Sequence, residues 1–233
     1  EQQLIESKLI IEDVLIEARK HYINIGYHNY LHALWVANYA LKLAKTWLNA
    51  LEIRSLIVAA LFHDAWHNWN PDLLDEFTSL TLYRKSMDEI IKNNPWFIVN
   101  DSICRNAIIG TVFKNRSKNS NKYAQILADL DIWSIWDDLE SFFYYSVWYC
   151  HELWLEWDLD KYFNWVETWY FKFLMSVEKF ILISKEAKQI LPHALKNIKK
   201  YYEIDLKIKK EIYSVLKNED IILDDFKKRF NLS

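Results

Sequence analysis

The stretch from residue 51 to residue 67, LEIRSLIVAALFHDAWH, decides how the chain folds. Its middle part, LIVAALF over 56–62, is continuously apolar, which is typical of a helix buried in a protein core. His63 and Asp64 follow directly, and a buried polar pair is costly unless it is hydrogen-bonded or bound to a metal. The stretch therefore predicts a buried helix that ends in a polar pair needing partners.

Glycine and proline are scarce, with 2 Gly and 3 Pro among 233 residues. Sheets and tight hairpins use these residues at their turns, so we expect an all-α fold. Apolar spacing predicts helices near 3–20, 29–47, 51–67, 75–92, 102–113, 124–132, 138–156, 161–183, 185–202 and 206–216. We expect one all-helical domain over 1–233, with a core at about 22–135 and aromatic-rich C-terminal helices at about 136–233.

The bulk composition argues against several classes of protein. A formal net charge of −3 gives no strong signal for nucleic-acid binding. The two cysteines, Cys104 and Cys150, form no CxxC pair, so we expect neither a zinc knuckle nor a disulfide framework, and a reduced, cytoplasmic setting. No apolar run reaches the ~18 residues of a spanning helix, so we expect no membrane partner.

Tryptophan is unusually frequent, with 12 residues. We interpret most of them as an aromatic core, and the excess also favours a homodimer interface. The alternative is that some tryptophans, such as those between 133 and 169, are stacking platforms for a nucleobase. Composition leaves both readings open.

Metal-binding side chains occur in three short groups along the chain. On a helix, residues four apart share a face. His28 could therefore bind the same metal ion as His32, and His67 the same ion as His63. Imidazole and carboxylate groups bind divalent metals. The members of the three groups are His28 and His32; His63, Asp64 and His67; and Asp129 and Asp131.

Each group taken singly also has a structural explanation. A His-Asp pair occurs often by chance, and two histidines four apart can form a surface pair or a hydrogen-bonded core pair. Asp129 and Asp131 could cap or solvate a helix, and they point ~200° apart on it, so only one is expected to face a metal. The joint order of the groups favours the metal site.

The segments 27–32 (YHNYLH), 60–67 (ALFHDAWH) and 127–132 (LADLDI) resemble the HD superfamily. More narrowly, they are similar to the bacterial predicted metal-dependent HD superfamily phosphohydrolases. Further matches to that group are Glu76, Ser79, Ile108-Ile109-Gly110-Thr111 and the helix around Asn197. The resemblance covers roughly residues 22–200 and implies an HD-domain helical bundle with additional C-terminal helices.

The resemblance also implies a ligand set and an activity. Residue by residue, the family's four metal ligands match His32, His63, Asp64 and Asp129. The implied activity is hydrolysis of a small phosphorylated compound, with a nucleotide favoured, by a metal-activated water. The metal is one divalent ion of Mn, Mg, Fe, Co, Ni or Zn.

Neighbouring residues are then assigned roles around that ion. Asp64 or Glu76 is the candidate base, and His67 could protonate the leaving group. Residues expected to bind the substrate are His28, Trp66, Thr111, Lys114 and Arg116. For Thr111 the alternative is closure of a helix. For Lys114, Arg116, Lys118 and Lys122 the alternative is a solvated basic loop rather than an electrostatic funnel.

The sequence departs from the family at substrate-facing positions. Gly26 stands near the place of an arginine before the Tyr-His pair, and no histidine follows Thr111. The second departure leads us to expect a single ion. Two other functions stay open: a nucleotide-binding or sequestering protein that does not hydrolyse, and a helical interaction protein that keeps the HD fold.

Overall fold

The chain is helical throughout the part that the structure describes. The structure is a computed structural model, and it describes residues 1–23, 26–67, 75–112, 120–133, 137–154, 157–172, 184–190 and 194–232. No strand occurs in these ranges, so the prediction of an all-α fold is confirmed. Within the same ranges, no helix combines the length and the apolar character needed to span a membrane.

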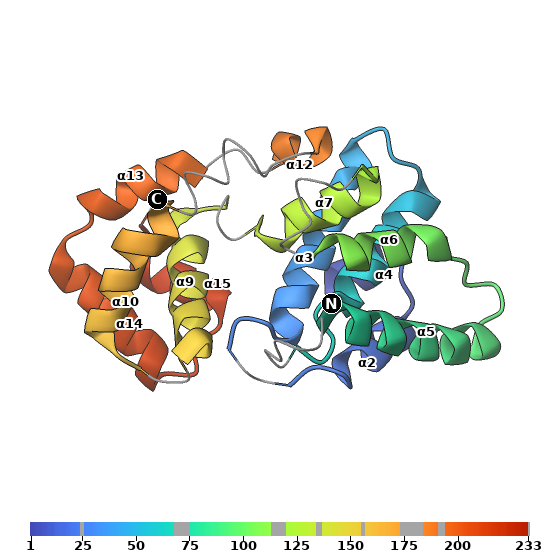
Figure 1. The fold of residues 1–233 in the computed structure, drawn as a ribbon, viewed down its shortest axis with the longest axis horizontal. Helices are drawn as coiled ribbons and strands as arrows, with labels where there is room; N and C mark the ends of the chain where they lie inside the picture. Colours follow the sequence, from blue (N-terminus) through green and yellow to red (C-terminus); the bar gives the residue numbers. More distant parts are fainter. Residues whose placement is uncertain are drawn as a thin grey trace. The chain divides into compact units, whose positions relative to one another are not determined.

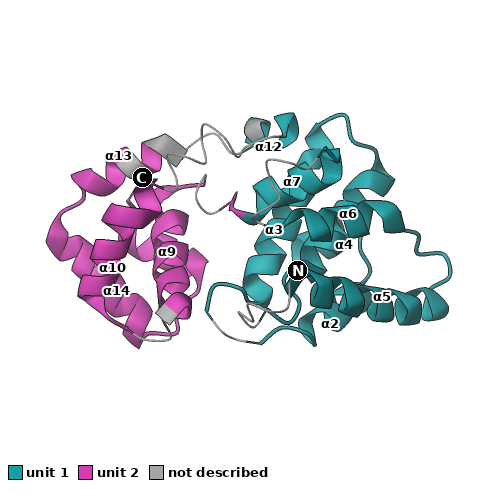
Figure 2. Cartoon of the chain, in the orientation of Figure 1, with its two compact units in different colours: residues 1–131, 182–190 teal, residues 132–181, 191–233 magenta. Residues whose placement is uncertain are grey.

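The chain divides into two compact units, each with its own helices (Figures 1 and 2). Unit 1 comprises Glu1–Asp131 and Leu182–Ile190, and unit 2 comprises Ile132–Ile181 and Leu191–Ser233. The helices of unit 1 are α1 (Gln2–Glu6), α2 (Glu12–Arg19), α3 (Tyr30–Lys42), η1 (Leu43–Lys45), α4 (Ala50–Phe62), α5 (Asp75–Asn93), α6 (Asp101–Gly110), α7 (Lys122–Asp131) and α12 (Lys185–Ile190). Those of unit 2 are α9 (Leu139–Trp154), α10 (Leu159–Trp165), η3 (Val166–Tyr170), α13 (Ala194–Glu203), α14 (Leu206–Asn218) and α15 (Leu223–Phe230).

Helix α4 is the centre of unit 1, as the apolar stretch predicts. Residues Leu56 to Phe62 are fully buried, and α4 packs against both α3 and α6. A capping box starts the helix, because the Asn49 side chain accepts from the backbone of Glu52 while the Glu52 side chain accepts from the backbone of Asn49. The prediction that this helix extends to about residue 67 was wrong, because α4 stops at Phe62 and residues 63–66 form a turn.

Helices α6 and α7 pack unusually closely in unit 1. A Cβ added to Gly110 would lie 2.4 Å from the Cβ of Ala124, a distance that real Cβ atoms do not reach. Gly110 is therefore required by this close approach. The contact holds α7, which ends at Asp131, against the core of the unit.

One further boundary and one helix differ from the sequence prediction. The predicted helix 3–20 is two helices, α1 and α2, separated by a turn in which Lys8 has a φ of 59°. Helix α15 was not predicted, although it has acidic residues in its first turn and basic residues in its last turn, as helix dipoles favour.

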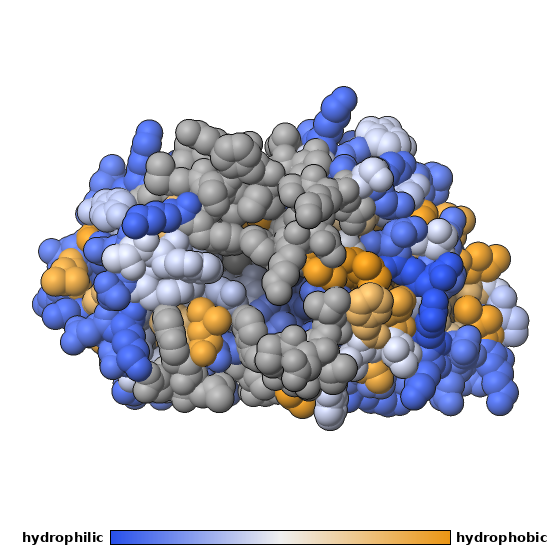
Figure 3. Space-filling view, viewed as in Figure 1, coloured by the Kyte–Doolittle hydropathy of each residue, from blue (hydrophilic) through white to orange (hydrophobic). Residues whose placement is uncertain are grey.

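Unit 2 is built on packed aromatic rings. Phe143 and Tyr201 are fully buried with their ring centroids 5.0 Å apart, and Trp165 stacks on Tyr170 at 4.6 Å. Trp169 is half exposed and stacks on Trp165. The described aromatic residues of this unit thus form mainly a core, and in the view of Figure 3 both units also expose many hydrophilic side chains.

Candidate metal centre

Four metal-binding side chains of unit 1 converge on one point. They are His32, His63, Asp64 and Asp131, and their ligand atoms all lie within 4.8 Å of one another. His63 Nε2 lies 2.9 Å from Asp64 Oδ2 and 3.1 Å from Asp131 Oδ1. His32 Nε2 lies 3.0 Å from Asp131 Oδ1 and 3.6 Å from Asp64 Oδ2. Both histidines are fully buried.

Three helix ends bring these residues together. His32 lies in the first turn of α3, where the Asn29 side chain accepts a hydrogen bond of 3.0 Å from the His32 backbone N–H. His63 is the first residue after α4, and Asp64 follows it in the turn. Asp131 is the last residue of α7. The buried packing of α3, α4 and α7 therefore fixes where the four side chains meet.

The backbone sets which nitrogen of His63 can act as a ligand. His63 Nδ1 lies 2.7 Å from the carbonyl oxygen of Ala60, which can only accept, so Nδ1 carries a hydrogen. In the neutral ring Nε2 then presents a lone pair, although it faces two carboxylates. Either a proton or a cation must lie between these groups. A histidine held in this way by a carbonyl is typical of metal sites.

The pKa shifts follow from the same arrangement. Burial alone would lower the pKa of His63, but Asp64 and Asp131 raise it well above its ordinary value. Burial lowers the pKa of His32. Burial would raise the pKa values of Asp64 and Asp131, yet the neighbouring histidines hold both below the usual range. Without a metal, His63 is thus a buried imidazolium between two carboxylates, and a divalent cation can replace its proton.

Two tyrosines that the sequence analysis did not single out support the cluster. Tyr27 Oη donates to the backbone oxygen of Asp131 at 3.3 Å, and its ring centroid lies 4.4 Å from that of His32. Tyr22 Oη donates to the backbone oxygen of Leu61 at 3.1 Å, just before the polar turn. No spacing rule marks such residues, because their partners are far away in the sequence.

The fourth member of the cluster is Asp131, whereas the resemblance implied Asp129. Asp129 is fully buried, and its Oδ2 accepts a hydrogen bond of 2.8 Å from the backbone N–H of Ser184. This bond ties the start of α12 to α7. The expectation that only one of the two aspartates faces the histidines agrees with the geometry, in which Asp131 belongs to the cluster and the expected ligand Asp129 does not.

His28 and His67 lie beside the cluster, but neither lies on a helix. His28 precedes α3 and His67 follows the turn after α4, so the predicted sharing of helix faces was wrong for both pairs. Their rings stack with centroids 4.0 Å apart and an interplanar angle of 15°. His67 Nδ1 lies 3.4 Å from Asp75 Oδ2.

The other predicted site residues have distinct surroundings. Burial and the charges of Asp64, Asp131 and Asp75 raise the pKa of Glu76, so this side chain lies near the cluster. Trp66 is 49% exposed and has a φ of 65°. Thr111 is buried, and its Oγ1 donates to the carbonyl of Ile108 at 2.8 Å, as expected for a residue that closes a helix.

The predicted basic loop lies mostly outside the described residues. This applies to Lys114, Arg116 and Lys118. Lys122 is the first residue of α7, and its Nζ lies 2.9 Å from Glu52 Oε1. Lys122 therefore has a structural partner at the start of α4.

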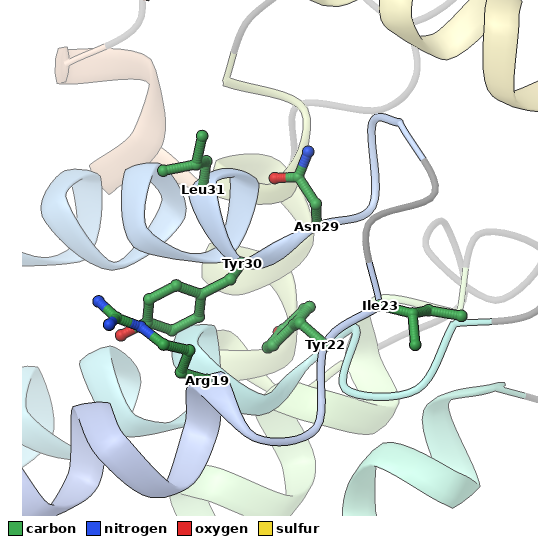
Figure 4. Close-up of a pocket in the computed structure, with 6 residues that line it drawn as sticks. All are labelled: Arg19, Tyr22, Ile23, Asn29, Tyr30 and Leu31. Atoms are coloured by element: carbon green, nitrogen blue, oxygen red, sulfur yellow. The ribbon is translucent and has the colours of Figure 1, made fainter. Parts of the chain in front are cut away.

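A cavity of about 260 Å³ adjoins the scaffold of the cluster (Figure 4). Two of its lining residues also support the candidate metal centre: Tyr22 contacts the end of α4, and Asn29 caps α3. The guanidinium of Arg19 lies 5.1 Å from the ring centroid of Tyr30. The full lining is Arg19, Tyr22, Ile23, Asn29, Tyr30 and Leu31.

Comparisons of the chain with protein-family models, with curated proteins and with solved structures find no match.

Proposed function

We propose that this chain is an HD-type metal-dependent phosphohydrolase that acts on a small phosphorylated compound, with a nucleotide as the favoured substrate. The observation that carries the proposal is the convergence of two imidazoles and two carboxylates from His32, His63, Asp64 and Asp131. The order of these residues along the chain is also that of the HD motif, with Asp131 in place of Asp129 as the last ligand.

The donor set fits a divalent cation. Two nitrogen and two carboxylate oxygen donors suit Mn, Fe, Co, Ni or Zn, and the backbone carbonyl of Ala60 keeps the His63 ring in the ligand tautomer. A bound ion supplies an acidified water and neutralises charge on a phosphoryl oxygen. Because both histidines are fully buried, the exposed side of the cluster is formed by the less buried Asp131.

Glu76 is the better candidate for the base that accepts the proton of the attacking water. A general base works best when its pKa lies near the working pH. Burial and the nearby carboxylates raise the pKa of Glu76, whereas the histidines hold that of Asp64 low. We therefore assign proton transfer to Glu76 and metal ligation to Asp64.

Trp66 is the candidate for holding the organic part of the substrate. Its indole is 49% exposed and follows Asp64 by two residues, and base stacking on an aromatic ring contributes about 1–3 kcal/mol. A left-handed backbone conformation is unfavourable for tryptophan, so the turn holds this residue against a local preference. These features motivate the choice of a nucleotide.

The test is phosphate release from a panel of nucleotides by the full chain supplied with Mn²⁺, Mg²⁺, Fe²⁺ or Co²⁺. We expect turnover of at least one nucleotide, and its loss in His63→Ala and Asp64→Ala. His151→Ala, in unit 2, is the matched control and should retain activity. Persistence of the activity in both cluster variants would overturn the proposal. Thermal stabilisation by a nucleotide without turnover would instead favour a binding protein.

A further inference from the structure

The cavity between the end of α2 and the start of α3 adjoins a carboxylate that an arginine and a tyrosine hold. Glu1 Oε1 accepts a hydrogen bond of 2.9 Å from Tyr30 Oη and pairs with the guanidinium of Arg19. Arg19 and Tyr30 both line the cavity, and Figure 4 shows their side chains next to each other. The two groups that bind this carboxylate therefore belong to the wall of an open space.

These two groups have the chemistry of an anion site. A guanidinium supplies a positive charge and several N–H donors, and a phenol adds an O–H donor. Burial would raise the pKa of Glu1, but the hydrogen bonds from Tyr30 and Arg19 lower it below its ordinary value. The side chains of Arg19 and Glu1 are 60% and 34% exposed, and such exposed ion pairs are weak. Another carboxylate can therefore replace that of Glu1.

The remainder of the cavity suits a small apolar group. Ile23 and Leu31 are 39% and 49% exposed, so an apolar ligand would cover hydrophobic surface that water now contacts. The rings of Tyr22 and Tyr30 lie beside them, with centroids 5.8 Å apart. The volume of about 260 Å³ is slightly below the roughly 300–1,000 Å³ of pockets that hold drug-sized ligands. The size fits a single ring or a short chain.

Two walls of the cavity are fixed by contacts outside it. Tyr22 Oη donates to the carbonyl oxygen of Leu61 at 3.1 Å, and Asn29 Oδ1 accepts from the backbone N–H of His32 at 3.0 Å. These contacts set the shape of the cavity before a ligand enters. A site that is formed in advance loses less conformational entropy on binding.

We propose that this cavity binds a small organic acid, a monocarboxylate with one ring or a short apolar chain. Its carboxylate takes the place of the Glu1 carboxylate between Arg19 and Tyr30, and its apolar part lies against Ile23 and Leu31. A single guanidinium balances one negative charge, which favours a monocarboxylate over a phosphate dianion. The site is independent of the proposed function, because its lining contains none of the four clustered residues of the candidate metal centre.

The test is a titration of the isotope-labelled full chain with benzoate, followed by nuclear magnetic resonance, which gives the Kd and locates the binding. We expect saturable shifts at the backbone amides of the lining residues. Arg19→Gln should weaken binding by about tenfold or more, because a hydrogen bond to a charged group contributes that much. Tyr30→Phe should weaken it less. Glu1→Gln should bind benzoate more tightly, because the competing group loses its charge.

Unit 2 offers a matched control pair. Arg229 Nη1 lies 2.7 Å from Glu219 Oε2, and both side chains are partly exposed, so Arg229→Gln and Glu219→Gln should leave benzoate binding unchanged. Benzamide, which has the shape of benzoate without its charge, should bind much more weakly. Because Glu1→Gln and Arg19→Gln move the affinity in opposite directions, a general loss of structure cannot imitate the expected result.

Several outcomes would overturn the proposal. Full affinity in Arg19→Gln, weaker binding in Glu1→Gln or equal binding of benzamide would each show that the carboxylate does not lie between Arg19 and Tyr30. Shifts that do not saturate, or that are confined to residues away from the cavity, would remove the site altogether. None of these results bears on nucleotide turnover, so the proposed function is tested separately.

Discussion

The two units bury polar groups in different ways. In unit 1, the buried His32, His63 and Asp64 lie next to Asp131, so these four ionisable side chains share one centre, while the buried Asp129 has its own partner outside it. In unit 2 the buried charged groups are paired separately. Glu140 accepts from the backbone N–H of Leu232, and the Nζ of Lys209 lies 4.0 Å from the ring centroid of Tyr201.

This difference distinguishes a site from a scaffold. An isolated buried charge is satisfied by one local partner, whereas several charges with shared partners need an additional ion or proton. Many of the described aromatic residues form the core of unit 2, and the candidate metal centre lies in unit 1.

Replacing one carboxylate in each unit gives the most direct contrast. Asp131→Asn should lower the affinity for Mn²⁺ by more than about a hundredfold, because loss of even an outer partner of a metal ligand costs about 10–100-fold. Glu140→Gln keeps an acceptor for the Leu232 N–H and should leave Mn²⁺ affinity unchanged. Isothermal titration calorimetry measures both.

Asp129→Asn adds a control within unit 1. It weakens the acceptor for the Ser184 N–H, so we expect a lower melting temperature with Mn²⁺ affinity largely retained. If Asp129→Asn instead lost the metal while Asp131→Asn retained it, the ligand set implied by the resemblance would be right and the observed cluster would not be the metal centre.

Core substitutions in the two units should separate stability from metal binding. Gly110→Ala should lower the free energy of unfolding by about 2 kcal/mol, since the new methyl group collides with Ala124 and overpacking typically costs 1–3 kcal/mol. It should also weaken Mn²⁺ binding, because α7 carries Asp131 at its end. Chemical denaturation and calorimetry report the two effects.

Phe143→Leu is the corresponding change in unit 2. It loses ring packing against Phe142 and Tyr201 and should cost roughly 1 kcal/mol of stability without a change in Mn²⁺ affinity. An equal loss of metal affinity in both variants would show that the cluster depends on the stability of the whole chain and not on the α6–α7 contact.

The sequence predicted the helical class and three of the four clustered residues for clear physical reasons. The apolar run of α4 identifies a core helix whatever its surroundings, and His63 and Asp64 follow it directly. The scarcity of glycine and proline excludes most alternatives to helices. These are local properties, so they can be seen without knowledge of the tertiary structure.

The missed features depend on tertiary contacts. Asp129 meets the Ser184 N–H and Asp131 meets two histidines, and the partners of both are distant in sequence. The end of α4 was misplaced because residues 63–66 form a turn, in which Trp66 has a left-handed conformation that tryptophan seldom takes. Asp75 was not singled out because its contact with His67 spans a turn and an intervening loop.

A further predicted effect is a dependence of stability on pH that arises from His63 in unit 1. Asp64 and Asp131 raise the pKa of His63 in the folded chain. In the metal-free protein, this interaction stabilises the fold fully below the ordinary histidine pKa of about 6.5 and is lost as the pH rises towards the raised value. The free energy of unfolding in the presence of a chelator should therefore fall between these two pH values, by at most about 1.4 kcal/mol per pH unit.

With Mn²⁺ the trend should reverse in that pH window, because the ion displaces the His63 proton and binds more tightly as the pH rises. Melting curves of the full chain across the window, with chelator and with Mn²⁺, measure both trends. His63→Gln should remove the chelator-dependent slope, whereas His151→Ala in unit 2 should keep it. A slope that persists without His63 would place the titrating group elsewhere and remove the electrostatic distinction between the two units.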